Sequence, residues 1–400
     1  MFREIITECF LQRGVRLNPR CGSLLSKGIV IFISINVVFL CADFRQFYNK
    51  GVLKLNPDPE FGKNTDWESL FYDTKKKMVI APDGSFFVSN TNQHTIMKFD
   101  SKGNRTKTFM QKGAGPSDGY YPGDLSILDG KYLVIGEYAE TRRISIFDLN
   151  GNFVKVVKVS TPPFVSLGLK NNKIAILTKK LLDKDRNENI VIIKDITTGE
   201  EKKIASFFTN RRIINVGPMI YSPGNFEGSV YLEKTNEGNL VVGFSSSNQI
   251  SIYTPDGKII RSIDLGFKPV AVTGDMIDEY KKYRVQSLKN DRFDSETIKR
   301  IEKASFESIM PDNLPYYCNL IVLPDNTLWV VEFANMEIAA NNRVRVYSLD
   351  GREIGKMVID FGVYKTNIYS SISFFKGSLY GLFEKKDSED IDLRIVKVNL

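Results

Sequence analysis

The stretch LSILDGKYLVIGEYAETRRISIFDLNGNFVKVVKV, residues 125–159, decides the fold. It contains an apolar strand, an Asp-Gly turn, a second strand that is almost entirely apolar, a polar turn, a third strand, an Asn-Gly turn and a fourth strand. Asp-Gly and Asn-Gly pairs accept the positive φ angles of tight hairpin turns. Strands that are apolar on both faces are typical of sheets covered on both sides. The stretch therefore predicts a four-stranded antiparallel sheet packed between two neighbours.

The same pattern occurs six times along the chain. Other copies begin at residues 78, 165, 230, 319 and 371, and the last stops after three strands. Four short strands repeated about every 40 to 50 residues are the signature of propeller blades. The sequence thus predicts an all-β protein, a six-bladed β-propeller. The glycines that close the third turn of each complete unit are Gly103, Gly151, Gly199, Gly257 and Gly351.

The sixth unit lacks an outer strand. Residues 51–55, Gly-Val-Leu-Lys-Leu, read as a strand that belongs to none of the repeats. We expect this N-terminal strand to complete the last blade and close the ring, because closure removes an open sheet edge.

Residues 111–122, QKGAGPSDGYYP, lie between the first two units. Their G-x-G spacing would suit a phosphate loop, but such a loop needs a helix N-terminus behind it, and here a strand follows. GAGPSDGYYP ahead of a blade resembles the opening motif of NHL-type six-bladed propellers, and residues 217–223 are a decayed second copy. Residues 311–317, before NLIVLPDNTLWVVE, resemble the TolB-like propellers of bacterial exported proteins. The resemblance covers about residues 55–400 and implies a fold rather than an activity.

Residues 1–42 are expected to be an export leader, with the propeller in residues 43–400. Spaced basic residues precede the apolar run IVIFISINVVFL at 29–40, which is the layout of a signal peptide. The run is shorter than the roughly 20 residues that span a bilayer. A buried strand is the alternative, although no turn or alternation frames the run.

Two kinds of processing remain open. Cys41 resembles the lipid-modified cysteine of bacterial lipoproteins, although Leu40 stands where that motif has a small residue. Cleavage after Ala42 is the competing possibility. In both cases we expect an exported protein, in the periplasm or at the outer membrane or cell surface. Only lipid modification of Cys41 would attach it to a membrane. Cys318 is the only cysteine of the body, so we expect no internal disulfide.

The composition of the chain excludes several classes of function. The chain has 400 residues, 42% of them hydrophobic, and a formal net charge of +8. No dense basic stripe follows the leader, so we expect no nucleic-acid partner. We also expect a monomeric domain. His94 is the only histidine, which excludes most Ser-His-Asp triads and imidazole-ligated metals. The surrounding SNTNQHT predicts that His94 lies in a solvated turn.

A ligand site is expected at one mouth of the central channel. Second turns and the loops that join blades emerge at the same end of a propeller, and tyrosines with charged groups form a rigid amphipathic rim there. We expect this rim to bind a peptide, protein or glycan without catalysis. Its candidate residues are Asn90, Tyr120, Tyr121, Glu137, Tyr138, Arg142 and Glu332.

The alternative function is a metal-dependent propeller hydrolase, lactonase or lyase. Glu137, Glu332 and Glu384 follow the second strands of their units, and carboxylates that converge on a channel could hold Ca²⁺. Without such a site we expect no cofactor.

Residues 274–313 interrupt the repeat between the fourth and fifth units and read as two helices. Asp294 is expected to cap the second helix, with Phe293 packed on Ile298 as a hydrophobic staple. A lid over the channel and a cover for apolar surface both remain open as the role of this insertion.

Overall fold

The computed structural model describes a β-propeller within the second of the two units into which the chain divides, residues 47–400. The unit of residues 1–46 lies outside the described part of the chain, so the predictions about the leader, Cys41 and Ala42 do too. The described residues are 48, 51–67, 77–137, 142–183, 185–210, 214–216, 219–221, 226–290, 294–307, 309–333, 342–362, 364–365, 372–385 and 393–399.

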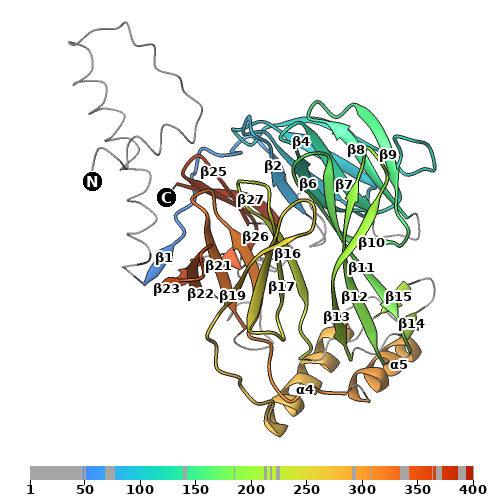
Figure 1. Ribbon diagram of the computed structural model, residues 1–400, viewed down its shortest axis with the longest axis vertical. Helices are drawn as coiled ribbons and strands as arrows, with labels where there is room; N and C mark the ends of the chain where they lie inside the picture. Colours follow the sequence, from blue (N-terminus) through green and yellow to red (C-terminus); the bar gives the residue numbers. More distant parts are fainter. Residues whose placement is uncertain are drawn as a thin grey trace, which may run out of the picture. The chain divides into compact units, whose positions relative to one another are not determined.

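Six sheets form the blades, and the predicted six-bladed architecture is confirmed (Figure 1). Blades one to three are β2 to β5, β6 to β9 and β10 to β13, each antiparallel and in sequence order. Their bounds are β2 Met78–Ile80, β3 Phe86–Asn90, β4 Thr95–Phe99, β5 Arg105–Phe109, β6 Pro122–Leu128, β7 Tyr132–Glu137, β8 Arg143–Asp148, β9 Phe153–Lys158, β10 Pro163–Gly168, β11 Lys173–Leu181, β12 Asn187–Asp195 and β13 Glu201–Thr209.

Blade four is β16 to β19, blade five is β20 to β23, and blade six contains β25, β26 and β27. A small hairpin, β14 with β15, follows blade three, and β24 pairs with the end of β26. The bounds are β14 Ile214–Val216, β15 Met219–Tyr221, β16 Val230–Lys234, β17 Leu240–Phe244, β18 Gln249–Tyr253, β19 Ile259–Asp264, β20 Tyr317–Val322, β21 Thr327–Glu332, β22 Arg343–Ser348, β23 Glu353–Asp360, β24 Tyr364–Lys365, β25 Ile372–Phe375, β26 Ser378–Lys385 and β27 Leu393–Asn399.

The core consists of apolar layers between neighbouring blades. Phe87 of blade one and Leu133 of blade two, both inaccessible to solvent, belong to one such layer. Leu240 of blade four packs with Ala175 of blade three in another. Each blade is therefore buried on both faces, which explains why its middle strands read as continuous apolar runs.

The third-turn glycines adopt the left-handed conformation that the sequence pattern predicts. Gly103 has φ of 90° and Gly151 has φ of 75°. A Cβ on Gly103 would also lie 2.7 Å from the backbone nitrogen of Gly62, so this turn needs glycine for space as well as for conformation.

Ring closure differs from the prediction. Residues Val52–Lys54 form β1, which pairs in parallel with β23 on the outer edge of blade five, not with blade six. The segment reaches blade six only afterwards, where Pro57 bridges Val398 and the Asp58 nitrogen donates to the Lys397 carbonyl at 2.7 Å. Pro57 has no N–H to extend a ladder, so the chain cannot continue as a regular strand along β27.

An irregular segment, residues 57–67, takes the place of the missing outer strand. The ring of Trp67 stacks on Phe99 of blade one, with 5.5 Å between centroids, and Phe61 contacts Tyr380 of blade six edge to face at 5.6 Å. Thr65 Oγ1 donates to the Gly103 carbonyl at 2.6 Å. Residues 57–67, the closing segment, therefore join the last blade to the first.

At four successive interfaces between blades, a lysine or arginine side chain of one blade donates a hydrogen bond to a backbone carbonyl of the next. Lys107 Nζ of blade one donates to the Asn150 carbonyl in the third turn of blade two at 2.7 Å. The matching donors on the outer strands of blades two, three and four, with their third-turn carbonyl partners, are Lys155 to Ile196, Lys202 to Asp256 and Arg261 to Asp350. Thr65 of the closing segment makes the corresponding hydrogen bond to Gly103, in the third turn of blade one.

The insertion forms two helices, α4 (Gly274–Asn290) and α5 (Ser295–Phe306). The Asp294 carboxylate accepts hydrogen bonds from the nitrogens of Glu296 and Thr297, which confirms the predicted cap; Phe293 lies outside the described residues. Tyr280 of α4 is buried in an apolar cluster that contains Phe226 together with side chains of the insertion and its flanking segments. Among the described residues, no helix is long and apolar enough to cross a membrane.

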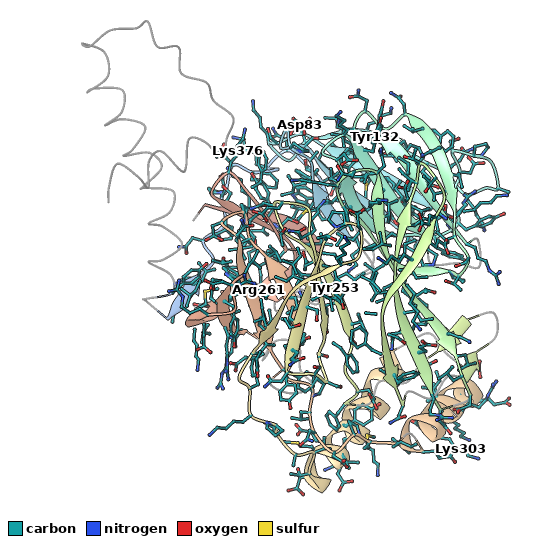
Figure 2. The ribbon with its side chains drawn as sticks, viewed as in Figure 1. Asp83, Tyr132, Tyr253, Arg261, Lys303 and Lys376 are labelled. Carbon is teal, nitrogen blue, oxygen red and sulfur yellow. The ribbon has the colours of Figure 1, made fainter. Side chains whose placement is uncertain are left out.

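The two mouths of the channel are distinct surfaces. First and third turns lie at one end of the blades, which we term the first-turn mouth; second turns and the loops between blades lie at the other, the second-turn mouth. Figure 2 shows the first-turn residues Asp83 and Lys376 at the opposite end from Lys303 of α5. The insertion thus lies at the second-turn mouth.

Candidate functional site

The loop of residues 111–122 packs against the second turn of blade one. Thr91 Oγ1 donates to the Pro122 carbonyl at 2.9 Å, and His94 Nδ1 hydrogen bonds with the Tyr120 carbonyl. The His94 ring meets the Tyr121 ring edge to face at 5.4 Å. His94 does lie in a turn, as predicted, but it is half-buried because it contacts Tyr120 and Tyr121 of this loop.

Glu137 supports the same loop from inside. Its side chain is fully buried, and its carboxylate lies 2.7 Å from Arg143 Nε. The other carboxylate oxygen accepts the Tyr120 nitrogen at 3.1 Å. Arg143 in turn donates to the carbonyls of Gly115 and Asp118. Glu137 therefore holds the backbone of Tyr120, and its side chain is not accessible to solvent.

Blade five contains a similar pair, although Arg345 lies opposite Val330 on the neighbouring strand and not opposite the glutamate. Arg345 Nε lies 2.7 Å from Glu332 Oε1, and the guanidinium sits over the Phe267 ring at 3.9 Å. Asn90 in blade one is also buried, and its amide bonds to Gln93. Polar residues at the ends of second strands thus bond mainly to the scaffold.

Two of the predicted rim residues remain accessible. Tyr121 is 45% exposed, and Arg142 is an exposed residue with a left-handed φ of 47°. Tyr120 is half-buried, and Tyr138 lies outside the described residues. The structure brings Tyr120, Tyr121 and Glu137 together and places Glu332 three blades away.

The calcium hypothesis receives no geometric support from these groups. Glu137 and Glu332 each already have a guanidinium partner, and Glu384 is half-buried near the end of β26. In the part of the chain that the structure describes, no three His, Cys, Asp or Glu side chains come close enough to hold a metal ion.

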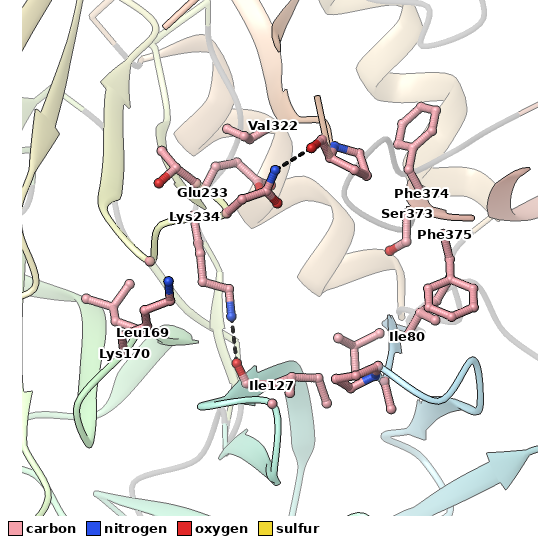
Figure 3. A pocket seen from close by; sticks show the side chains of 18 of the residues that line it. Ile80, Ile127, Leu169, Lys170, Glu233, Lys234, Val322, Ser373, Phe374 and Phe375 are labelled. Atoms are coloured by element: carbon pink, nitrogen blue, oxygen red, sulfur yellow. Dashed lines mark hydrogen bonds between the residues drawn. The ribbon is translucent and has the colours of Figure 1, made fainter. Parts of the chain in front are cut away.

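A cavity of about 580 Å³ opens at the first-turn mouth, where the sequence analysis predicted no site (Figure 3). All six blades contribute to its wall. The residues that define its chemistry are Ile80, Asp129, Lys170, Glu233, Lys234 and Phe374.

Lys234 crosses this end of the channel. It is the last residue of β16 in blade four, yet its Nζ donates to the Ile127 carbonyl of blade two at 2.6 Å (Figure 3). The same Nζ donates to the Gly168 carbonyl of blade three at 2.8 Å. Burial lowers the pKa of Lys234 to about 8, against the opposing attraction of Glu233 and Asp129.

Two carboxyl groups with shifted pKa values belong to the inner strands, Glu233 beside Lys234 and Asp124, whose charge acts on Glu233. Burial raises the pKa of Glu233 to about 8, although Lys234 and Lys77 oppose the shift. Burial also raises the pKa of Asp124, whose carboxylate accepts the Ser166 nitrogen at 2.7 Å. Inner-strand charges of this kind were the available sequence signal, because Glu233 and Lys234 end a strand that otherwise packs between blades.

An apolar wall faces these charges. Figure 3 shows Phe374 and Phe375 of blade six across the cavity from Lys234, with Ile80 and Ile127 between them. The Phe374 ring is held edge to face on Trp329 at 5.1 Å. The cavity is therefore amphipathic, with acidic and basic side chains on one side and aromatic rings on the other.

No protein-family model matches the chain, and no curated protein matches it by sequence. Solved structures do share its fold. A protein from Bacteroides fragilis described as exported gives a TM-score of 0.51 at 11% identity, over 87% of this chain and 98% of the other. A DUF4221 family member from Bacteroides vulgatus gives 0.43 at 13% identity, over 86% and 94%. A catalytically inactive virginiamycin B lyase from Staphylococcus aureus gives 0.41 at 11% identity, over 82% of each chain. At these identities the first likeness shows the propeller fold alone.

Proposed function

We propose that this protein is an exported binding protein that holds its ligand in the cavity at the first-turn mouth. One observation carries the proposal: all six blades wall a cavity of about 580 Å³ with charges on one side and aromatic rings on the other. Binding sites for small ligands or for the ends of larger ones are typically concave, mostly apolar and of about 300 to 1,000 Å³, with a few polar groups that orient the ligand.

Export is supported by the charged and apolar leader of residues 1–42. The Bacteroides fragilis protein with the same fold is also described as exported. We propose an NHL-type or TolB-like propeller, either released after cleavage at Ala42 or attached to a membrane through Cys41. A Cys41→Ser variant distinguishes the two, because only a lipoprotein would move from the membrane fraction to the soluble fraction.

The ligand is proposed to be a peptide, protein or glycan, bound by a monomeric domain. For a protein-sized partner, Tyr121 and Arg142 at the second-turn mouth form a second candidate surface. What favours this surface is that Tyr121 is exposed while its loop is fixed by Arg143 and His94, so little entropy is lost on contact.

Binding is preferred over calcium-dependent hydrolysis because Glu137 and Glu332 are already paired with arginines. Thermal unfolding with and without Ca²⁺ separates the two functions: a rise in melting temperature with Ca²⁺, together with esterase or lactonase turnover, would favour the enzyme.

Blocking the cavity tests the proposal. The Ser373 hydroxyl points into it in Figure 3, so a Ser373→Trp variant should fill the site. Ser262→Trp, on the exposed outer strand of blade four, is the matched control. Ligands from a screen of peptides, glycans and small acids should bind the wild type and the control but not Ser373→Trp. Ligands that bind all three proteins equally would place the site elsewhere.

A further inference from the structure

We infer that the cavity recognises an apolar carboxylate, either a small acid or the C-terminal residue of a peptide, with the carboxylate at Lys234 and the apolar group against Phe374 and Phe375. This inference rests on the proposed function and adds the chemistry of the ligand.

The donor capacity of Lys234 carries the first step. An ammonium group has three N–H donors. Two are used on the carbonyls of Ile127 and Gly168, at 2.6 and 2.8 Å. These bonds fix Nζ at the cavity wall and leave one N–H for a ligand. Hydrogen bonds from a charged donor to a carboxylate are about twice as strong as neutral ones.

The surrounding charges favour an anion. Lys170 also lines the cavity and repels Lys234 electrostatically. The nearby Asp129 carboxylate already accepts the nitrogens of Asn171 and Asn172 at 2.9 and 3.0 Å. Besides Asp129, whose oxygens are engaged by backbone donors, Glu233 lines this side of the cavity, and its pKa of about 8 leaves it mostly protonated at neutral pH. The two lysines therefore carry the net charge here. A ligand anion would relieve the repulsion between them.

The hydrogen-bond donors that line the cavity suit a ligand group with a single negative charge. The lining residues, all of them described, include no arginine and no helix N-terminus, the groups that most often hold phosphate. The opposite wall offers Phe374, Phe375 and Ile80. A flat or branched apolar group covers this wall while its carboxylate reaches across to Lys234.

A matched ligand pair tests the inference on the wild-type protein. Titration calorimetry would compare N-acetyl-L-phenylalanine with N-acetyl-L-phenylalaninamide, which differ only in the carboxylate. We expect the acid to bind at least about tenfold more tightly than the amide. The tripeptide Gly-Gly-Phe then distinguishes the sources: tighter binding of the tripeptide indicates a peptide C-terminus, and tighter binding of the acetylated amino acid indicates a small acid.

Two variants assign the effect to Lys234. Lys234→Met should reduce the affinity for the acid about tenfold and leave that for the amide unchanged. Lys107→Met is the matched control, because Lys107 also bridges two backbone carbonyls, Asn150 and Gly151, but far from the cavity. Equal binding of acid and amide to the wild type would overturn the inference while leaving a cavity ligand in place. If neither compound binds but Ser373→Trp blocks another ligand, the inference fails and the proposed function stands. If no ligand is sensitive to Ser373→Trp, both fail.

Discussion

Arg143 Nε lies 2.7 Å from the buried carboxylate of Glu137, and Arg345 Nε lies at the same distance from the half-buried Glu332 three blades later. In both blades the glutamate ends the second strand and the arginine lies on the third strand beside it. In blade two the pair also holds the backbone of Tyr120 and of the loop that leads into the blade. A position that looks like a channel ligand in the sequence is thus a link between a blade and its loop.

Removing the buried Glu137 side chain should lower the free energy of unfolding substantially. Glu137→Ala leaves Arg143, itself only 12% exposed, without its counter-charge, and breaking a buried pair typically costs about 3 kcal/mol or more. Urea unfolding measures the loss. Glu60→Ala is the control, because Glu60 pairs with Lys63 on the surface and such pairs contribute about 1 kcal/mol or less. Equal losses in the two variants would show that the Glu137 pair is not a structural link.

Residues 57–67, the closing segment, should contribute more to the free energy of unfolding than β1 does. Trp67 is buried between blades one and six and stacks on Phe99, so Trp67→Ala should cost about 3 to 5 kcal/mol of unfolding free energy. Val52 lies on β1 and is 49% exposed, so Val52→Ala should change stability by about 0.5 kcal/mol or less. Thermal and denaturant unfolding compare the two. A Trp67→Ala protein as stable as the parent would mean that residues 57–67 do not close the ring.

Stability should fall as the pH rises through neutrality because of Glu233. The folded-state pKa is about 8 and the ordinary value about 4.3, so the folded protein keeps a proton that the unfolded chain has lost between these values. The carboxyl is flanked by Lys234, Lys77 and Asp124. Lys234 acts in the opposite sense above pH 8, because its own folded-state pKa is lowered to about 8.

Glu233→Gln removes the first effect. Relative to this variant, the wild type should lose unfolding free energy steadily from about pH 4 to about pH 8. Chemical denaturation at several pH values measures the difference. A difference between the two proteins that does not change with pH would show that Glu233 has an ordinary pKa.

The sequence predicts the blades well because each blade is built from local signals. Positive-φ glycines such as Gly103 and Gly351 mark the turns, and the continuous apolar strands mark burial on both faces. Closure could not be assigned, because the pattern Val-Leu-Lys-Leu of β1 shows that a strand forms but not which edge it joins. Pro57 and Pro59 beyond it are the signal that a regular outer strand cannot continue.

The candidate site was harder to predict for a similar reason. A glutamate at the end of a strand reads equally as a solvated group, a ligand or half of an ion pair, and only a partner such as Arg143 decides between them. The cavity depends on Lys234 reaching carbonyls that lie 66 and 107 residues away in the sequence. No local pattern contains such a contact, although two charges at the end of an inner strand indicate that something polar faces the channel.

Affinity measurements on two single variants would show whether the ligand lies in the cavity at the first-turn mouth. Calorimetry with a ligand that binds the wild type would compare Ser373→Trp, which fills the cavity, with Tyr121→Ala, which removes the exposed ring at the second-turn mouth. If the ligand lies in the cavity, Ser373→Trp should reduce the affinity at least about tenfold and Tyr121→Ala should change it by about twofold or less. Unchanged binding by Ser373→Trp together with loss of binding by Tyr121→Ala would contradict this expectation and place the ligand on the rim that contains Tyr121 and Arg142.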